Sequence, residues 1–375
     1  MSITRRSVLK GTAAASAAAV AAPAILKASD ALASSGQVNV FAWGDYIQEN
    51  MITKFEGDTG IKINLSTFGS NDEAEQKLKA AGGKGFDVIF PSITNGTNYY
   101  GEDLLAPLDE SRLNVSAIVP SMMRDSVRLG GTYRGRRMLL PFDWGTEAIT
   151  FDSSVFPLAD DEVSYGSLWT PDAVGKATFR QKSGMIGVGL YLETTGALQA
   201  NRMLDVYKSE EDAHRIWGQI ANFIIEHKQN IAAFWNNGTE ATNAFKQAGA
   251  SVGQSWDTTG LLLSREDPKW KYRMPKEGGM TWMDSIGIPS GAENTQQAYA
   301  FINAMLDPQM AGMFSANTGY NSAVVGAANH AGETYKNQFL EIYNDDTLAN
   351  LWWYPADTPW FATLRQEYVE RITNA

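Results

Sequence analysis

Strand-like and helix-like segments alternate between Val38 and Phe90, and this order constrains the fold more than any other feature of the sequence. The apolar, β-branched runs expected in buried strands lie at 38–43, 61–68 and 86–90, and amphipathic helical spacing lies at 47–56 and 71–80. A β-α-β-α-β order predicts a mainly parallel sheet flanked by helices. Ligands of such sheets bind beyond the carboxyl ends of the strands, so we expect a binding site in the loops that follow these three strands.

A second alternating pattern predicts a second domain. Within it, Met185 to Leu190 is interpreted as a strand, 213–227 as a helix and Val252 to Trp256 as another strand. The extended segment 139–145 is interpreted as the first crossing between domains, and 280–288 as the return. A chain of this length exceeds what one core usually organises. We therefore expect lobe 1 at 37–143 plus 284–325, and lobe 2 at 144–283 plus 326–375.

The first 33 residues have the pattern of an export signal. A charged start with paired Arg5-Arg6 precedes a mild apolar stretch at 11–25, and Ala31-Leu32-Ala33 offers the small residues that a signal peptidase reads. The paired arginines resemble the twin-arginine pattern, with Val8 where Phe is usual. We expect residues 1–33 to be a twin-arginine signal peptide, cleaved after Ala33, and the protein to reside in the periplasm.

Charge and composition exclude several classes of function. The net charge is −11, and the expected leader carries four basic residues and one acid, which leaves −14 on residues 34–375. Nucleic acids and anionic membranes need clustered cations on their partner, so neither is an expected partner. The chain has no cysteine, and His214, His227 and His330 are isolated. We therefore expect no metal, no cofactor and no enzymatic activity.

Aromatic residues and carboxylates occur together at strand ends. Trp43-Gly44-Asp45-Tyr46, Trp256-Asp257 and Trp282-Met283-Asp284 are the three cases. A carboxylate can take the charged nitrogen of an alkylammonium through a charge-assisted hydrogen bond, and an aromatic face attracts the same cation. An exposed ion pair contributes only ~0–1 kcal/mol, so the acids are useful only where the rings exclude water. The alternative, in which each Trp is core and each Asp caps a helix, stays open.

These segments resemble the spermidine/putrescine-binding proteins of bacterial ABC transporters. The matching stretches are 41–46, 86–92, 141–146, 230–234, 275–285 and 317–320. The resemblance implies an α/β, two-lobed class II periplasmic binding protein fold, with a ligand cleft between the lobes. It also implies a polyamine ligand, permease subunits in the inner membrane as partners, and ligand contacts from Trp43, Asp45, Tyr46, Trp256, Trp282, Asp284 and Tyr320.

Departures from the family pattern leave the ligand open. Where the family has an acidic pair in the second lobe, this sequence offers only Glu193, and Asp257 directly follows Trp256. Glu193 and Asp257 complete the expected site, but a diamine is not the only fitting ligand. A monoamine, a zwitterion resembling an amino acid or a neutral sugar remain alternatives, as does, more remotely, an exported enzyme. A ligand carboxylate would need an arginine, for which Arg202 and Arg265 are candidates. Asp143 and Glu147, at the first crossing, are expected either to bond hinge backbone or to line the cleft. We expect a monomer.

Overall fold

The computed structural model describes residues 36–375, so the expected signal peptide lies outside the described residues. The described residues separate into two compact units, unit 1 with residues 36–144 and 282–349, and unit 2 with residues 145–281 and 350–375. The chain leaves unit 1 within β7 (Leu139–Asp152) and returns within β12 (Met280–Pro289). Both crossings fall within the segments 139–145 and 280–288, in which the sequence placed them.

Residues 326–349 belong to unit 1, whereas the expected domain limits assigned them to the second lobe. Aromatic packing accounts for their position. The centroid of the Trp144 ring lies 5.1 Å from that of Tyr343 and 6.4 Å from that of Phe339. In addition, Tyr335 Oη donates a 2.8 Å hydrogen bond to Asn321 Oδ1. The two ring contacts join residues far apart in the sequence, so no local sequence pattern predicts them.

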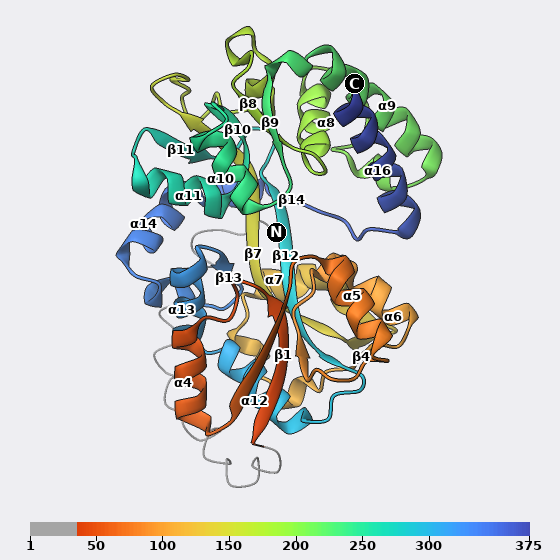
Figure 1. The fold of residues 1–375 in the computed structure, drawn as a ribbon, viewed down its shortest axis with the longest axis vertical. Coiled ribbons are helices and arrows are strands. Elements are labelled where there is room, and N and C mark those ends of the chain that lie inside the picture. The colour runs from red at the N-terminus through yellow and green to blue at the C-terminus, as the bar shows by residue number, and fades with distance from the viewer. Residues whose placement is uncertain (1–35) are drawn as a thin grey trace. The chain divides into compact units, whose positions relative to one another are not determined.

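Unit 1 contains the expected parallel sheet. Strands β2, β1 and β3 are neighbours in that order, and the Gly287 segment of β12 pairs antiparallel with β3. In Figure 1, α5 and α6 lie on one side of these strands, and α4 and α13 lie on the other. The bounds are β1 (Gln37–Trp43), α4 (Glu49–Thr59), β2 (Lys62–Phe68), α5 (Asn71–Ala80), β3 (Val88–Ile89), α6 (Gly96–Gly101), α12 (Thr295–Met305) and α13 (Pro308–Thr318).

Unit 2 repeats the layered arrangement with different strands. Strands β10, β8 and β9 are parallel neighbours, while β10 and β11 pair antiparallel with β7. Helices α8, α9 and α16 gather on one side of these strands, and α10 and α11 on the other (Figure 1). The bounds are β8 (Ala177–Arg180), α8 (Gly184–Thr194), α9 (Glu210–Glu226), β9 (Ile231–Trp235), α10 (Gly238–Lys246), β10 (Val252–Trp256), α11 (Asp257–Glu266), β11 (Trp270–Arg273) and α16 (Pro359–Asn374).

The strand interpreted at Met185 to Leu190 is wrong, because this segment lies inside α8. Its residues are buried on all sides, and a fully apolar run has no periodicity that separates a helix from a strand. Its glycines allow neighbouring side chains to approach closely. A Cβ atom at Gly187 would lie 2.8 Å from the Tyr165 ring, and one at Gly189 would lie 2.1 Å from Met203 Sδ.

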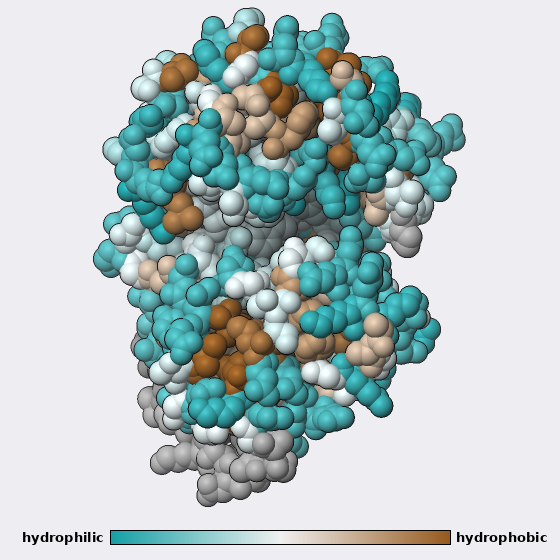
Figure 2. All heavy atoms as spheres, in the orientation of Figure 1, coloured by the Kyte–Doolittle hydropathy of each residue, from teal (hydrophilic) through white to brown (hydrophobic). Residues whose placement is uncertain are grey.

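The remaining elements are short. They are β4 (Leu105–Ala106), α7 (Pro120–Ser126), β5 (Thr132–Tyr133), β6 (Arg136–Arg137), β13 (Asn321–Ser322), α14 (Glu333–Ile342), α15 (Asp345–Ala349) and β14 (Trp352–Trp353). Hydrophilic residues cover most of the face in Figure 2, with smaller apolar areas on both units. Within 36–375, no helix has both the length and the apolar character needed to cross a bilayer.

Candidate functional site

Loops that follow the parallel strands of unit 1 gather polar and aromatic side chains. Trp43 ends β1, and a turn closed by the 3.2 Å bond from Tyr46 N to Trp43 O carries Asp45. Ser92 follows β3, and Asn71 begins the helix after β2. Asn71 holds Ser92 through two hydrogen bonds, of 2.9 Å to the Ser92 amide and 3.0 Å to its Oγ. The three loops singled out by the sequence therefore all contribute side chains to one place.

Asp284 is the carboxylate at the centre of this arrangement. It lies in β12, where its backbone forms an isolated bridge with Ser92, and it is 5 % exposed. Tyr46 Oη donates a 2.7 Å hydrogen bond to Asp284 Oδ2, and Ser92 Oγ donates one of 2.6 Å to Oδ1. Both oxygens therefore accept a donor from a different loop.

Burial controls the protonation of the two acids. Desolvation raises the pKa of Asp284 to about 6, although hydrogen bonds from Ser92 and Tyr46 act in the opposite direction, and the negative charge of Asp45 adds to the increase. Asp45 is exposed on one side, but the protein around it also raises its pKa by desolvation. Burial raises the pKa of Tyr46 well above its ordinary value, so its hydroxyl stays a donor. Two acids close enough to repel each other favour a cation beside them.

Aromatic rings gather around Tyr46, whose hydroxyl bonds this carboxylate. The Tyr320 ring lies 5.3 Å from that of Trp282 and 6.1 Å from that of Tyr46, and the Trp43 and Tyr46 rings are 6.4 Å apart. The Trp282 indole N–H is buried without a hydrogen-bond acceptor in the described part of the chain. The Trp43 indole N–H is also buried, and it faces Asp284 closely enough to lower the pKa of that acid. We call Trp43, Asp45, Tyr46, Trp282, Asp284 and Tyr320 the acid–aromatic cluster. All six were expected from the sequence, and the structure brings them together.

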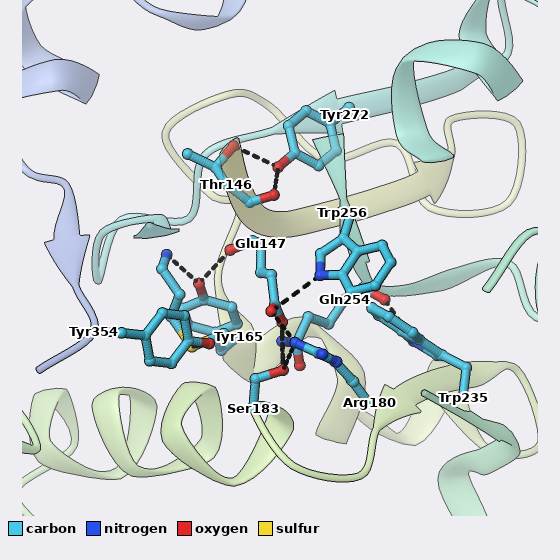
Figure 3. Close-up of polar contacts among 11 residues, drawn as sticks. Thr146, Glu147, Tyr165, Arg180, Ser183, Trp235, Gln254, Trp256, Tyr272 and Tyr354 are labelled. Carbon is cyan, nitrogen blue, oxygen red and sulfur yellow. Dashed lines mark hydrogen bonds and ion pairs between the residues drawn. The ribbon is translucent and has the colours of Figure 1, made fainter. Parts of the chain in front are cut away.

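In unit 2, Trp256 ends β10 and donates a 3.1 Å hydrogen bond from Nε1 to Glu147 Oε1. Figure 3 shows Glu147 at the centre of a group of polar side chains. It is 1 % exposed and also accepts hydrogen bonds from Gln254 Nε2 at 2.5 Å, from Ser183 Oγ and from Arg180 Nη1. The Glu147 carboxylate thus accepts hydrogen bonds from four side chains of unit 2. The sequence analysis had expected it either to bond hinge backbone or to line the cleft.

Arg180 is the residue near Trp256 that sequence reasoning missed. Its guanidinium carbon lies 4.8 Å from the centroid of the Trp256 ring and 5.4 Å from that of Trp235. Arg180 ends β8 just as Trp256 ends the neighbouring parallel strand β10. Placing the strand at 185–190 instead of 177–180 hid this adjacency.

The carboxylates of Glu193 and Asp257 accept hydrogen bonds from backbone amides. Glu193 accepts bonds from the backbone N–H groups of Ala200, Arg202 and Met203 at 2.9–3.0 Å. Asp257 is fully buried, and its oxygens accept bonds from the amides of Thr146 at 3.1 Å and Thr258 at 2.9 Å. Both carboxylates thus bond backbone N–H groups of unit 2.

The two remaining candidates differ in their surroundings. The Arg202 guanidinium donates to Glu277 O at 3.2 Å and to Asn350 Oδ1 at 3.3 Å. Asp143 is fully buried in unit 1, where its charge contributes to the raised pKa of Tyr46. No group of three or more His, Cys, Asp or Glu side chains is arranged to hold a metal ion within residues 36–375.

Two α/β units, with carboxylates and aromatic rings at the strand ends, define a protein that binds a small solute. The profile of the family described as bacterial extracellular solute-binding protein matches residues 50–339. The chain belongs to this family, which confirms the solute-binding class expected from the sequence motifs.

Individual relatives agree with the family. The chain is 24% identical over 333 residues to the spermidine/putrescine-binding periplasmic protein of Escherichia coli K12, covering 88% of this chain and 90% of the relative. It is 27% identical over 278 residues to the putrescine-binding periplasmic protein SpuD of Pseudomonas aeruginosa UCBPP-PA14, covering 73% and 74%. The solved structure of the spermidine/putrescine ABC transporter substrate-binding protein PotD of Streptococcus pneumoniae has a TM-score of 0.74 at 23% identity and covers 90% of this chain and 98% of that one. The expected binding-protein fold is confirmed by this likeness.

Proposed function

We propose that the protein is the periplasmic substrate-binding component of an ABC uptake transporter and that it captures a small protonated amine. The names of its relatives point to a polyamine such as putrescine or spermidine as the first ligand to test. One observation carries the proposal. Asp284 is a buried carboxylate with a raised pKa that accepts a hydrogen bond from Tyr46, and the ring centroids of Trp43 and Tyr320 lie 6.4 and 6.1 Å from that of Tyr46.

Burial is what gives the carboxylate enough binding free energy. A micromolar affinity corresponds to about 8 kcal/mol, far above the ~0–1 kcal/mol of an exposed ion pair. At a shielded position an ammonium gains charge-assisted hydrogen bonds to Asp284 and cation–π contact with the rings. It also relieves the repulsion between Asp284 and Asp45. No covalent chemistry enters this function, and we propose a receptor rather than an enzyme.

Binding couples to transport through a change in the populations of two states. A solute with higher affinity for one conformation of the two units shifts the protein toward it, and permease subunits in the inner membrane would recognise that form. That the solute bridges both lobes, and that the receptor acts as a monomer, stay predictions.

The test is the substitution Asp284→Asn, which keeps the shape of the side chain and removes its charge. We expect the affinity for putrescine, measured by isothermal titration calorimetry, to fall by more than about tenfold, because a charge-assisted bond contributes roughly 1.5–3 kcal/mol. Asp58→Asn is the matched control, because Asp58 is an exposed acid of unit 1 that pairs with Lys54. Unchanged affinity in a folded Asp284→Asn protein would count against the proposal. A thermal-shift screen of amines against sugars tests the neutral-solute alternative.

We further propose that residues 1–33 direct export through the twin-arginine route. Arg5-Arg6, the apolar stretch that follows and Ala31-Leu32-Ala33 support this signal and its cleavage after Ala33. A periplasmic location agrees with the names of the relatives, which are periplasmic proteins.

A further inference from the structure

The loop after β3 brings Ser92 to Asp284, and backbone contacts fix the two residues against each other. Ser285, the neighbour of Asp284 in β12, donates two hydrogen bonds to Pro91 O, of 2.9 Å from its amide and 2.7 Å from its Oγ. The backbones of Ser92 and Asp284 form an isolated bridge. The freedom that remains to Ser92 is the rotation of its side chain and of its hydroxyl hydrogen.

Asn71 restricts both of these rotations. Its Oδ1 accepts a 2.9 Å bond from the Ser92 amide, and its Nδ2 donates a 3.0 Å bond to Ser92 Oγ. A backbone amide can only donate, so the side-chain oxygen of Asn71 must face it, and the NH₂ group then faces Oγ. Because Ser92 Oγ accepts from Asn71, its single hydrogen is directed to Asp284 Oδ1, 2.6 Å away.

The start of α5 holds Asn71 in this position. Ser70 is the N-cap and accepts a 3.1 Å bond from Glu73 N, and the Glu73 carboxylate accepts a 2.8 Å bond from Gly69 N. These two bonds close the turn that begins the helix, and neither uses the side chain of Asn71. Both polar atoms of that side chain are therefore committed to Ser92.

Two hydroxyl hydrogens thus point at one carboxylate, from Ser92 at Oδ1 and from Tyr46 at Oδ2 of Asp284. An ionised carboxylate accepts both of them, whereas a protonated carboxyl would turn its own O–H toward one of these donors. The arrangement therefore favours the charged form and opposes the cost of burial. Each carboxylate oxygen keeps a further lone pair with which it can accept from an ammonium.

We propose that Asn71 is a positioning residue of the ammonium site, which orients the Ser92 hydroxyl toward Asp284 and so keeps this carboxylate ionised for a cation. Asn71 acts through Ser92 and does not bind the solute itself. All three residues lie in unit 1. This inference rests on the proposed function, in which Asp284 takes the ammonium group.

The other groups that act on the charge of Asp284 stay unchanged in the tests. The negative charge of Asp45 raises the pKa of Asp284, and the hydrogen bond from Tyr46 lowers it. Tyr46 in turn faces Asp143 and Tyr320. An effect of Asn71 is therefore assigned to the Ser92 hydroxyl only if it disappears when that hydroxyl is removed, which a double-mutant cycle measures.

The first experiment measures the pKa of Asp284 in the unliganded protein, by NMR titration of its carboxyl carbon. We expect Ser92→Ala to raise this pKa by about one unit, because a hydrogen bond to a charged group is lost. Asn71→Ala should raise it by about half a unit in the wild-type background and by less than about 0.2 in the Ser92→Ala background. Asn98→Ala is the matched control and should leave it unchanged, because Asn98 is a partly exposed asparagine of unit 1 that bonds Glu75.

The second experiment measures the affinity of Asn71→Ala for putrescine by calorimetry at two pH values. A pKa raised by about half a unit lowers the ionised fraction of Asp284 about threefold at pH 5 and hardly at pH 8. We therefore expect the variant to bind about threefold more weakly than the wild type at pH 5 and less than about 1.5-fold more weakly at pH 8. A role confined to packing would weaken binding equally at both.

If Asn71→Ala does not fold, Asn71→Asp keeps the acceptor for the Ser92 amide and replaces the donor to Oγ by a second acceptor. The Ser92 hydroxyl is then drawn away from Asp284, and a negative charge is added. We expect a larger rise in the pKa of Asp284 than the charge alone produces, and Asn71→Asp in the Ser92→Ala background measures the effect of the charge.

The outcomes separate this inference from the proposed function. An unchanged pKa of Asp284 in folded Asn71 variants overturns the inference, as does a rise that persists in full without the Ser92 hydroxyl. If amines bind and Asn71→Ala weakens them equally at pH 5 and pH 8, the receptor stands and the positioning role is wrong. If the pKa changes as expected but no amine binds the wild-type protein, the proposed function falls and the control of Asp284 by Asn71 stands.

Discussion

Burial of Asp284 makes its ionised form costly in the unliganded protein, and this gives amine binding a pH dependence. With a pKa of about 6, the carboxylate is charged at pH 8 and largely protonated at pH 5. An alkylammonium keeps its proton throughout this range, because its pKa lies near that of lysine, about 10.4. We therefore expect an affinity about tenfold lower at pH 5 than at pH 8, measured by calorimetry at constant ionic strength. The Asp284→Asn protein should show a flatter profile, and an equally steep one would assign the proton to another group.

The same shift affects stability with the opposite sign. The folded pKa lies above the unfolded value of 3.8, so the native state binds more protons between these two values. The contribution of Asp284 to the free energy of unfolding is therefore fully present below about pH 4 and is lost as the pH rises through 6. The loss amounts to about 3 kcal/mol. The ionised Asp284 carboxylate therefore destabilises the unliganded protein at neutral pH, and a bound cation would neutralise its charge.

Individual residues differ in how far the sequence could reveal them. Trp43, Asp45 and Tyr46 follow a recognisable strand, so their position at the edge of a parallel sheet was predictable. The position of Arg180 was not predictable, because its side chain contacts Trp256 and Glu147, which lie 76 and 33 positions away in the sequence. Glu193 and Asp257 looked like ligand acids, but backbone N–H groups of the loop after α8 bond Glu193, and the Thr146 amide of β7 bonds Asp257. Such competition between ligand and backbone depends on tertiary structure.

At the scale of elements, the strands and helices with regular spacing were predictable and the fully buried ones were not. Helices α4 and α5 carry one polar face, and Ser70 caps α5 by accepting a 3.1 Å bond from Glu73 N, so the sequence located both within a few residues. Helix α8 is apolar on every face, so its sequence is indistinguishable from that of a buried strand. The sequence analysis therefore placed a strand at 185–190, whereas the strand is β8 at 177–180.

The loop after α8 depends on Glu193. Asn201, Arg202 and Met203 have φ values of 50°, 52° and 60°, a left-handed conformation that costs non-glycine residues about 1–2 kcal/mol each. The carboxylate compensates by accepting three backbone N–H bonds from this segment. We expect Glu193→Gln, which offers one acceptor oxygen, to lower the free energy of unfolding by about 2 kcal/mol in urea titrations. Amine affinity should change by less than about threefold. A large loss of affinity without a loss of stability would instead make Glu193 a ligand contact.

At the scale of the whole molecule, the two-unit organisation was predictable from length and from the repeated alternation of strands and helices. The placement of residues 326–349 was not, because the Tyr335 hydrogen bond and the Trp144–Tyr343 ring contact that hold them in unit 1 are long-range. The net charge of −14 on residues 34–375 bears on solubility and association and does not determine the fold. It favours solubility and, at long range, the approach of a cation.

Export is the remaining property of the whole chain, and it can be tested through Arg5 and Arg6. We expect the double substitution Arg5→Lys and Arg6→Lys to leave the precursor in the cytoplasm, because a twin-arginine signal requires the guanidinium pair while the charge of the leader is unchanged. Lys10→Arg is the control, since it alters the same region without touching the pair. The measurements are cell fractionation and the intact mass of the periplasmic form, expected to begin at Ser34. Normal export of the double variant would assign the leader to the general secretion route, and a different mass would move the cleavage site.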